Sequence, residues 1–164
     1  VCMWRELTNL WQSVRDPEYA HLLMESLPLY GLAFGVTLLV VAFVVNERKC
    51  RLLALGIIFV SSASVWPYLD FRLKATPRIL ATRAVEYGPI IQEQTQLRQD
   101  TAWAYYIMAA VTLIAMSMSR SRHAHWGILA VLVGSVLLFW LSVWLHKKEC
   151  EVYHPNIKRH EVSR

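Results

Sequence analysis

The chain has 164 residues, of which 55% are hydrophobic and 18% charged, and a formal net charge of +5. A mean hydropathy of +0.33 is too apolar for an ordinary soluble domain of this length. The basic balance predicts no nucleic-acid partner, because Lys and Arg that flank membrane helices account for it. Three cysteines with no C-x-x-C pair argue against a disulfide framework, a thiolate metal site and covalently attached haem.

The first 15 residues predict a short amphipathic helix that lies in the membrane interface. Its apolar side chains recur at spacings of three and four, with polar residues between them: Trp4, Leu7, Trp11 and Val14. Asp16 and Pro17 then provide an N-cap and a first-turn proline, so a second helix begins there.

Four apolar blocks follow, each with roughly the ~20 residues that a helix needs to cross ~30 Å of hydrocarbon. They are residues 27–45, 52–69, 101–118 and 126–145. No Lys, Arg, Asp, Glu or His falls inside a block, whereas a soluble helix would show a polar face. The sequence therefore predicts an all-α, integral membrane four-helix bundle over residues 16–154, followed by a polar tail, residues 155–164.

The connections between blocks differ in length. Residues 46–51 and 119–125 are short, so the helices that they join are antiparallel neighbours. The connection between the second and third spans has about thirty residues, too many for a turn, and predicts helical structure. We expect one helix from Thr76-Pro77 to Gly88-Pro89 and a second, residues 90–100, that runs into the third span.

An even number of spans places this long connection on the same side of the membrane as both termini, here called the terminal side. Aromatic residues also collect there. Interfacial anchoring explains Trp and Tyr at a membrane edge. A surface that contacts other membrane subunits is the second interpretation, and its candidate residues are Trp4, Trp11, Trp66, Tyr68, Trp103, Trp140 and Trp144.

Catalytic and metal-ligating patterns are missing from the sequence. It has no Gly-rich phosphate loop, zincin motif, nucleophile elbow or paired-carboxylate spacing. We also expect no buried acid or base within the spans, which argues against a transporter. We therefore predict no catalytic residue and no metal site.

Two histidines of the terminal side, His21 before the first span and His146 after the fourth, are the candidate cofactor ligands. If these helices are adjacent, the two imidazoles can approach each other, and neutral imidazole is a common axial ligand of b-type haem. Glu25 and Asp70 would then orient a histidine. The alternative is that each imidazole only forms hydrogen bonds at the headgroup level.

Around these residues the chain resembles a family of uncharacterised bacterial four-helix inner-membrane domains. That family opens its first helix with His-Pro-x-x-x-His-x-Pro and closes its fourth with Gly-His-x-Gly-Gly-x-x-Val-Tyr. His21 and Pro28 stand at the first spacing, and His146 is followed at the family's interval by Val152 and Tyr153. Residues 68–71, Tyr-Leu-Asp-Phe, are similar to the family's Leu-Leu-Asp-Trp at the end of the second helix.

The chain departs from that pattern where a cofactor site would be. Leu22 replaces the family's first proline and Ser26 its second histidine. Lys148 and Glu149 stand in place of paired glycines, and Asp100 in place of a histidine. The resemblance covers most of residues 18–154 and implies a redox membrane setting with an eroded histidine site.

Together these observations predict a non-catalytic structural or accessory subunit of a bacterial inner-membrane redox or energy-converting complex. Its expected partners are other membrane subunits and lipid. The alternatives are a b-type haem electron carrier that uses His21 and His146 and, third, a small-solute transporter. Five of the 17 Lys and Arg residues lie in the two short connections. The raw count makes the terminal side cytoplasmic, but the dense charge of the short connections favours the reverse, and we expect a periplasmic terminal side.

Overall fold

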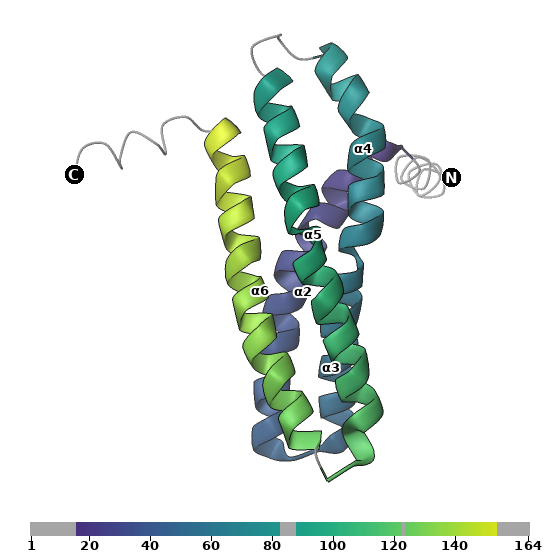
Figure 1. Cartoon of the computed structure of the whole chain (residues 1–164), viewed down its shortest axis with the longest axis vertical. Coiled ribbons are helices and arrows are strands. Elements are labelled where there is room, and N and C mark those ends of the chain that lie inside the picture. The colour runs from purple at the N-terminus through teal and green to yellow at the C-terminus, as the bar shows by residue number, and fades with distance from the viewer. Residues whose placement is uncertain (1–15, 83–87, 123, 154–164) are drawn as a thin grey trace, which may run out of the picture.

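The computed structural model describes residues 16–82, 88–122 and 124–153, and this part of the chain is a bundle of long helices (Figure 1). The helices are α2 (Pro17–Val45), α3 (Arg48–Ala63), α4 (Val65–Thr82), α5 (Gly88–Ser117), a 3-10 turn η2 (Met118–Arg120) and α6 (Ala124–Tyr153). The predicted N-terminal helix, with Trp4 and Trp11, and the tail of residues 155–164 lie outside the described residues.

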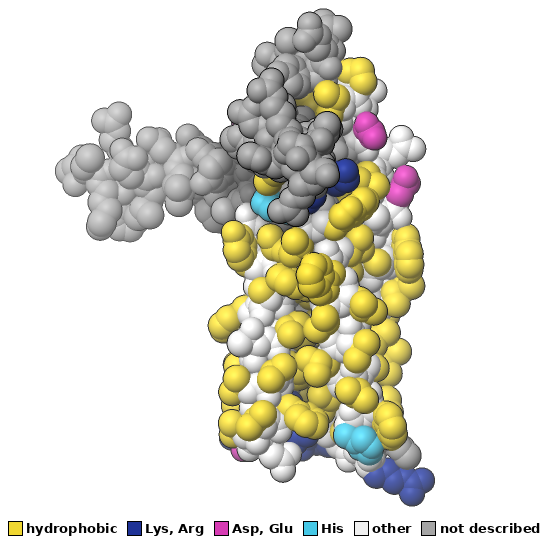
Figure 2. All heavy atoms as spheres, turned by 90° about the vertical axis from the view of Figure 1, so that its left-hand side faces the viewer, with side chains coloured by type: hydrophobic (Ala, Val, Ile, Leu, Met, Phe, Trp, Pro, Cys, Tyr) yellow, Lys and Arg dark blue, Asp and Glu magenta, His cyan; other side chains and the backbone are white. Residues whose placement is uncertain are grey.

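Four helical segments are long and apolar enough to cross a membrane, α3 and α4 together forming the second. They are Met24–Val45, Arg48–Ala81, Gly88–Arg120 and Ala124–Cys150. The predicted all-α four-helix bundle is therefore confirmed, and the chain is a multi-pass membrane protein. Hydrophobic side chains cover most of the outer face that Figure 2 presents, and charged side chains appear towards its two ends.

Alternating spacings of three and four keep one face of each helix inside the bundle. The pattern is clearest on α6, where the buried positions are Ile128, Val131, Ser135, Leu138, Ser142, Leu145 and Glu149. This is the seven-residue repeat of left-handed helix packing. Positions between them, such as Leu137 and Trp140, are exposed on the outer face.

Small residues let the helices of each hairpin approach closely, as in many membrane bundles. A Cβ atom added at Gly31 of α2 would lie 2.0 Å from Ser61 Oγ of α3, and one at Gly35 would lie 2.6 Å from Ile58 Cγ1. Gly134 of α6 packs in the same way against Met108 of α5, at 2.9 Å. The close contacts of α2 with α3 and of α5 with α6 therefore require glycine, which has no Cβ atom, at these positions.

The second span is interrupted at Ser64, between α3 and α4. Pro67 has no amide hydrogen for the carbonyl of Ala63, four residues earlier. On either side the helical pattern continues, since Ser64 N–H donates to Val60 O at 2.9 Å and Tyr68 N–H donates to Ser64 O at 3.1 Å.

The connection between the second and third spans differs in part from the expectation. Pro77 lies inside α4, so no helix begins at Thr76. Pro77 is exposed, so the carbonyl that it leaves without an amide partner is on the outer side of the helix. Gly88 and Pro89 begin α5 instead of ending a helix, as suits a proline in the first turn. The expected continuity of residues 90–100 with the third span is confirmed.

Candidate functional site

At the terminal side, each of the four spans places one charged side chain inside the bundle. Glu25 comes from α2, Arg72 from α4, Arg98 from α5 and Glu149 from α6; we call these four residues the ion cluster. Their side chains are only 10–20% exposed. Buried charges are stable only when they are paired, so their mutual contacts decide what the site can do.

Glu149 is the centre of the ion cluster. Arg98 Nε donates to its Oε1 at 2.9 Å, and Arg98 Nη2 pairs with its Oε2. Arg72 Nη1 pairs with Oε1 from the other side. Arg98 Nη2 also reaches Glu25 Oε1, at 3.4 Å. Two guanidinium groups thus face two carboxyl groups, and the two-pronged contact of Arg98 with Glu149 has the geometry of a strong ion pair.

Tyr68 supports both arginines from within the bundle. Its hydroxyl contacts Arg72 Nη1, and its ring centroid lies 5.2 Å from Arg98 Cζ and 5.9 Å from Arg72 Cζ, within cation–π range. Arg72 Nε also donates to Thr95 Oγ1 at 3.2 Å. The prediction that Tyr68 belongs to a partner surface is wrong, because the side chain is 1% exposed and packs beneath the guanidinium groups.

The other candidate aromatics that the structure describes are exposed and come from three spans: Trp66 71%, Trp103 63%, Trp140 68% and Trp144 43%. Tyr30, which is 69% exposed, belongs to the remaining span, the first. Aromatic side chains on the outside of every span form the belt expected at a membrane–water interface. Their role in contacting a partner stays a prediction.

The position of the aromatic belt indicates how deep in the membrane the ion cluster lies. On each span, five or six positions separate the charged residue of the ion cluster from an exposed aromatic residue. In every case the charged residue is the one farther from the bilayer centre. At 1.5 Å per residue this is roughly 7–9 Å. The ion cluster therefore lies at about the level of the lipid headgroups, enclosed by helices.

Below the cluster, α5 and α6 carry further polar pairs at intervals of seven residues. Arg98 faces Glu149, and Tyr105 Oη lies 2.6 Å from Ser142 Oγ one repeat deeper. The same antiparallel register places Thr112 opposite Ser135, and both side chains are 0% exposed. We call these three pairs the polar rungs.

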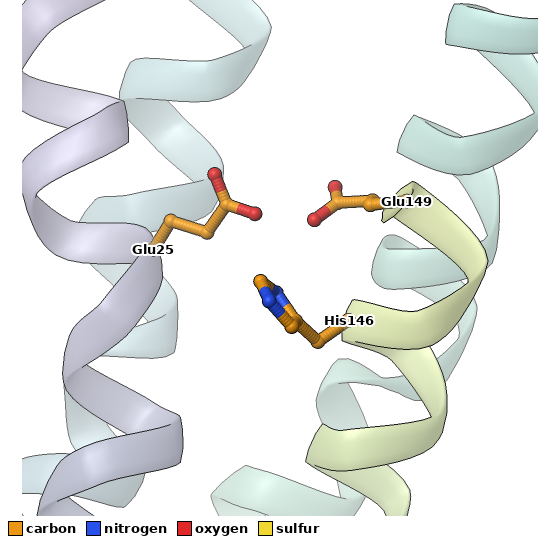
Figure 3. A group of neighbouring side chains, drawn as sticks. All are labelled: Glu25, His146 and Glu149. Carbon is orange, nitrogen blue, oxygen red and sulfur yellow. The ribbon is translucent and has the colours of Figure 1, made fainter. Parts of the chain in front are cut away.

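A cavity of about 260 Å³ opens beside the ion cluster, between α2, α5 and α6. Its lining residues are Glu25, Ser26, Pro28, Leu29, Tyr30, Arg98, Tyr105, Ser142 and His146. Figure 3 shows the carboxylate of Glu25 pointing from α2 towards Glu149 and His146 of α6. One polar atom from each of these three residues lies within 4.8 Å of the others.

These three residues have the donor types of a metal site, but the surrounding charges oppose one. Glu149 already accepts hydrogen bonds from Arg72 and Arg98, and two adjacent guanidinium groups repel a cation. The arrangement instead suits a polar ligand that makes hydrogen bonds with groups of both signs.

The candidate cofactor ligands are placed as follows. His146 lies at the cavity, with its Nε2 3.6 Å from Cys150 Sγ. The side chain of His21 lies outside the described residues, and the backbone places it on α2 one turn before Glu25. The described group that faces His146 across the cavity is thus Glu25, as expected for an orienting carboxylate. Asp70 does not take that role, because it is exposed and pairs with Lys74 at 2.6 Å.

The apolar blocks themselves hold no acid or base, but the buried charges just outside them were not expected from the sequence. All four helices continue past their apolar blocks, and the charges just beyond those blocks turn into the bundle. One signal in the sequence marks them. Arg98, Tyr105 and Thr112 on one helix, and Ser135, Ser142 and Glu149 on another, repeat at intervals of seven.

Comparison with protein-family models, with curated proteins and with solved structures gives no match to this chain.

Proposed function

We propose that the chain is a non-catalytic structural or accessory subunit of a bacterial inner-membrane redox or energy-converting complex, in which another membrane helix packs against α3. The observation that carries the proposal is Gly56. A Cβ atom there would meet nothing within 4 Å in the described part of the chain, whereas the other five glycines each have a neighbour within that distance.

A glycine in the middle of a helix costs about 0.5–1 kcal/mol relative to alanine. At Gly31 and Gly35 the close contact of α2 with α3 offsets this cost. Gly56 has no such contact, and its outer flanks Leu53 and Val60 are 60% and 58% exposed. A notch of this kind between apolar side chains is the surface that a second transmembrane helix uses for close approach.

The ion cluster supports the non-catalytic part of the proposal. Its charges are engaged with one another and hold the ends of four helices together, which is a structural task. The redox setting and the bacterial inner membrane rest on the family resemblance of the sequence.

The two alternatives have less support. A haem between His21 and His146 would have to fit where Glu25 faces His146, in a cavity of about 260 Å³, below the ~300–1,000 Å³ typical of ligand pockets. A transporter needs a path through the bundle, but Leu55, Thr112 and Val131 deeper in it are at most 1% exposed.

The test is purification of the tagged chain from its native membrane in mild detergent. We expect stoichiometric membrane partners with the unmodified chain and their loss with Gly56→Leu, which fills the notch. Ala110→Leu adds the same side chain at an exposed position of α5 and should retain them. A solitary monomer, or equal recovery from both variants, would contradict the proposal. A reduced-minus-oxidised spectrum of the same sample tests for haem.

A further inference from the structure

The cavity between α2, α5 and α6 has groups of both charge signs on its walls. Glu25 offers a carboxylate from α2, and Arg98 a guanidinium from α5. Tyr105 of α5 and Ser142 and His146 of α6 add two hydroxyls and an imidazole to the walls. The cavity therefore contains hydrogen-bond acceptors for an ammonium group and donors for a phosphate group.

The cavity opens at the depth of the lipid headgroups. Its rim residues Ser26, Tyr30 and His146 are exposed, and Tyr30 belongs to the aromatic belt. Towards the bilayer centre the same helix exposes Phe34, at 62%. A molecule with its polar end in the cavity can thus lay an apolar tail along α2 within the hydrocarbon.

From this geometry we propose that the cavity binds the phosphoethanolamine headgroup of a membrane phospholipid. The ammonium group lies at Glu25, and the phosphate accepts hydrogen bonds from Arg98 and His146. The site is independent of the proposed partner helix at Gly56.

The two kinds of group on the cavity walls select a zwitterion. Glu25 offers an acceptor on α2, while Arg98 and His146 offer donors on the facing helices, so a headgroup with a charge of one sign would leave one wall without its complement. A zwitterionic headgroup adds a charge of each sign beside its complement. Phosphocholine has the same net charge, but its quaternary ammonium has no N–H to donate to Glu25, so the site distinguishes the two headgroups.

The test uses the full-length chain, purified in detergent, stripped of lipid and studied by native mass spectrometry. Phosphatidylethanolamine, phosphatidylcholine and phosphatidylglycerol with identical acyl chains are added in turn. We expect one bound phosphatidylethanolamine, with roughly tenfold weaker binding of the other two, the effect of one lost charge-assisted hydrogen bond.

Three variants locate the site. Glu25→Gln should weaken phosphatidylethanolamine binding about tenfold, and Ser26→Phe, which fills the mouth without touching an ion pair, should remove it. Asp70→Asn removes an exposed carboxylate at the same end of the bundle and should leave binding unchanged. Equal binding of the three lipids, or an unchanged affinity in Ser26→Phe, would overturn the proposal.

A further arm separates a lipid from a soluble ligand with the same polar group. Water-soluble glycerophosphoethanolamine should displace little of the bound lipid at equal concentration, because it lacks the tail that lies along α2. Displacement as effective as that by the lipid would assign the cavity to a soluble phosphoethanolamine compound and overturn the membrane source.

Discussion

At the scale of single residues, Glu149 is the buried carboxylate that pairs with both arginines of the ion cluster. One carboxylate, 10% exposed, accepts hydrogen bonds from guanidinium groups of two other helices. Breaking a buried ion pair by removing one partner typically destabilises a protein by 3–5 kcal/mol, because it leaves an unpaired charge behind. Here two arginines would lose their partner together.

We therefore expect Glu149→Gln to lower the free energy of unfolding by about 3–5 kcal/mol, measured by denaturant titration in detergent micelles. Asp70→Asn is the matched control, since the Asp70–Lys74 pair is exposed and such pairs contribute roughly 0–1 kcal/mol. Equal losses in the two variants would show that the ion cluster does not stabilise the bundle.

Part of the candidate site could be predicted from the sequence. His146 and Glu25 were expected near each other and lie at one cavity. Arg72 and Arg98 were not expected, because their importance comes from partners far away in the sequence. Arg72 and Glu149 are 77 positions apart, and only the packed bundle brings them into contact.

At the scale of helices, α5 and α6 show how the register of two spans is specified. Apolar contacts alone allow two membrane helices to slide, whereas polar pairs at intervals of seven residues fit together in one register. The upper two polar rungs are bonded across the helices, by the Arg98–Glu149 ion pair and the Tyr105–Ser142 hydrogen bond. In the third rung Thr112 donates to the carbonyl of Met108 in its own helix. Ser135 Oγ has no partner among the described residues.

This difference predicts different effects for two serine-to-alanine substitutions one repeat apart. Ser142→Ala removes the partner of the buried Tyr105 hydroxyl and should lower the free energy of unfolding by about 1 kcal/mol. Ser135→Ala removes a hydroxyl that has no described partner, and should leave stability unchanged or raise it. Thermal unfolding of both variants in one detergent is the measurement, and a larger loss for Ser135→Ala would refute the assigned pairing.

The helices themselves were largely predictable, but their ends were not. Charge-free blocks of about twenty residues mark the hydrocarbon, and the four spans follow from them. A helix does not stop where its apolar block stops, because its backbone hydrogen bonds continue regardless of side-chain polarity. Arg98 and Glu149 are thus helical residues that turn inward, where hydropathy alone indicates flanking charges.

At the scale of the whole molecule, the two ends of the bundle differ in chemistry. The terminal side has the ion cluster and the aromatic belt, and the opposite end has the short connections with their basic residues. Cys50 begins the second span at one end and Cys150 ends the fourth at the other. These two cysteines therefore report on opposite sides of the membrane.

We expect the terminal side to be periplasmic, so a membrane-impermeant thiol reagent added to intact cells should modify Cys150 and spare Cys50. Cys2 is first replaced by serine, because it is predicted on the same side as Cys150. Permeabilised cells provide the control that Cys50 can react. Labelling of Cys50 in intact cells, with Cys150 protected, would reverse the orientation.

The sharing of the ion cluster between two hairpins has a consequence for biosynthesis. The hairpin of α2, α3 and α4 contains one acid and one base of the cluster, Glu25 and Arg72, and the hairpin of α5 and α6 contains Arg98 and Glu149. The second hairpin can pair its own two charges, as it does in the structure. The first depends on the second, since Arg72 meets Glu149 and Glu25 meets Arg98. A nascent chain that has reached only Thr82 thus lacks the carboxylate with which Arg72 pairs in the finished bundle, so we expect the ion cluster to form only after α6 has been synthesised.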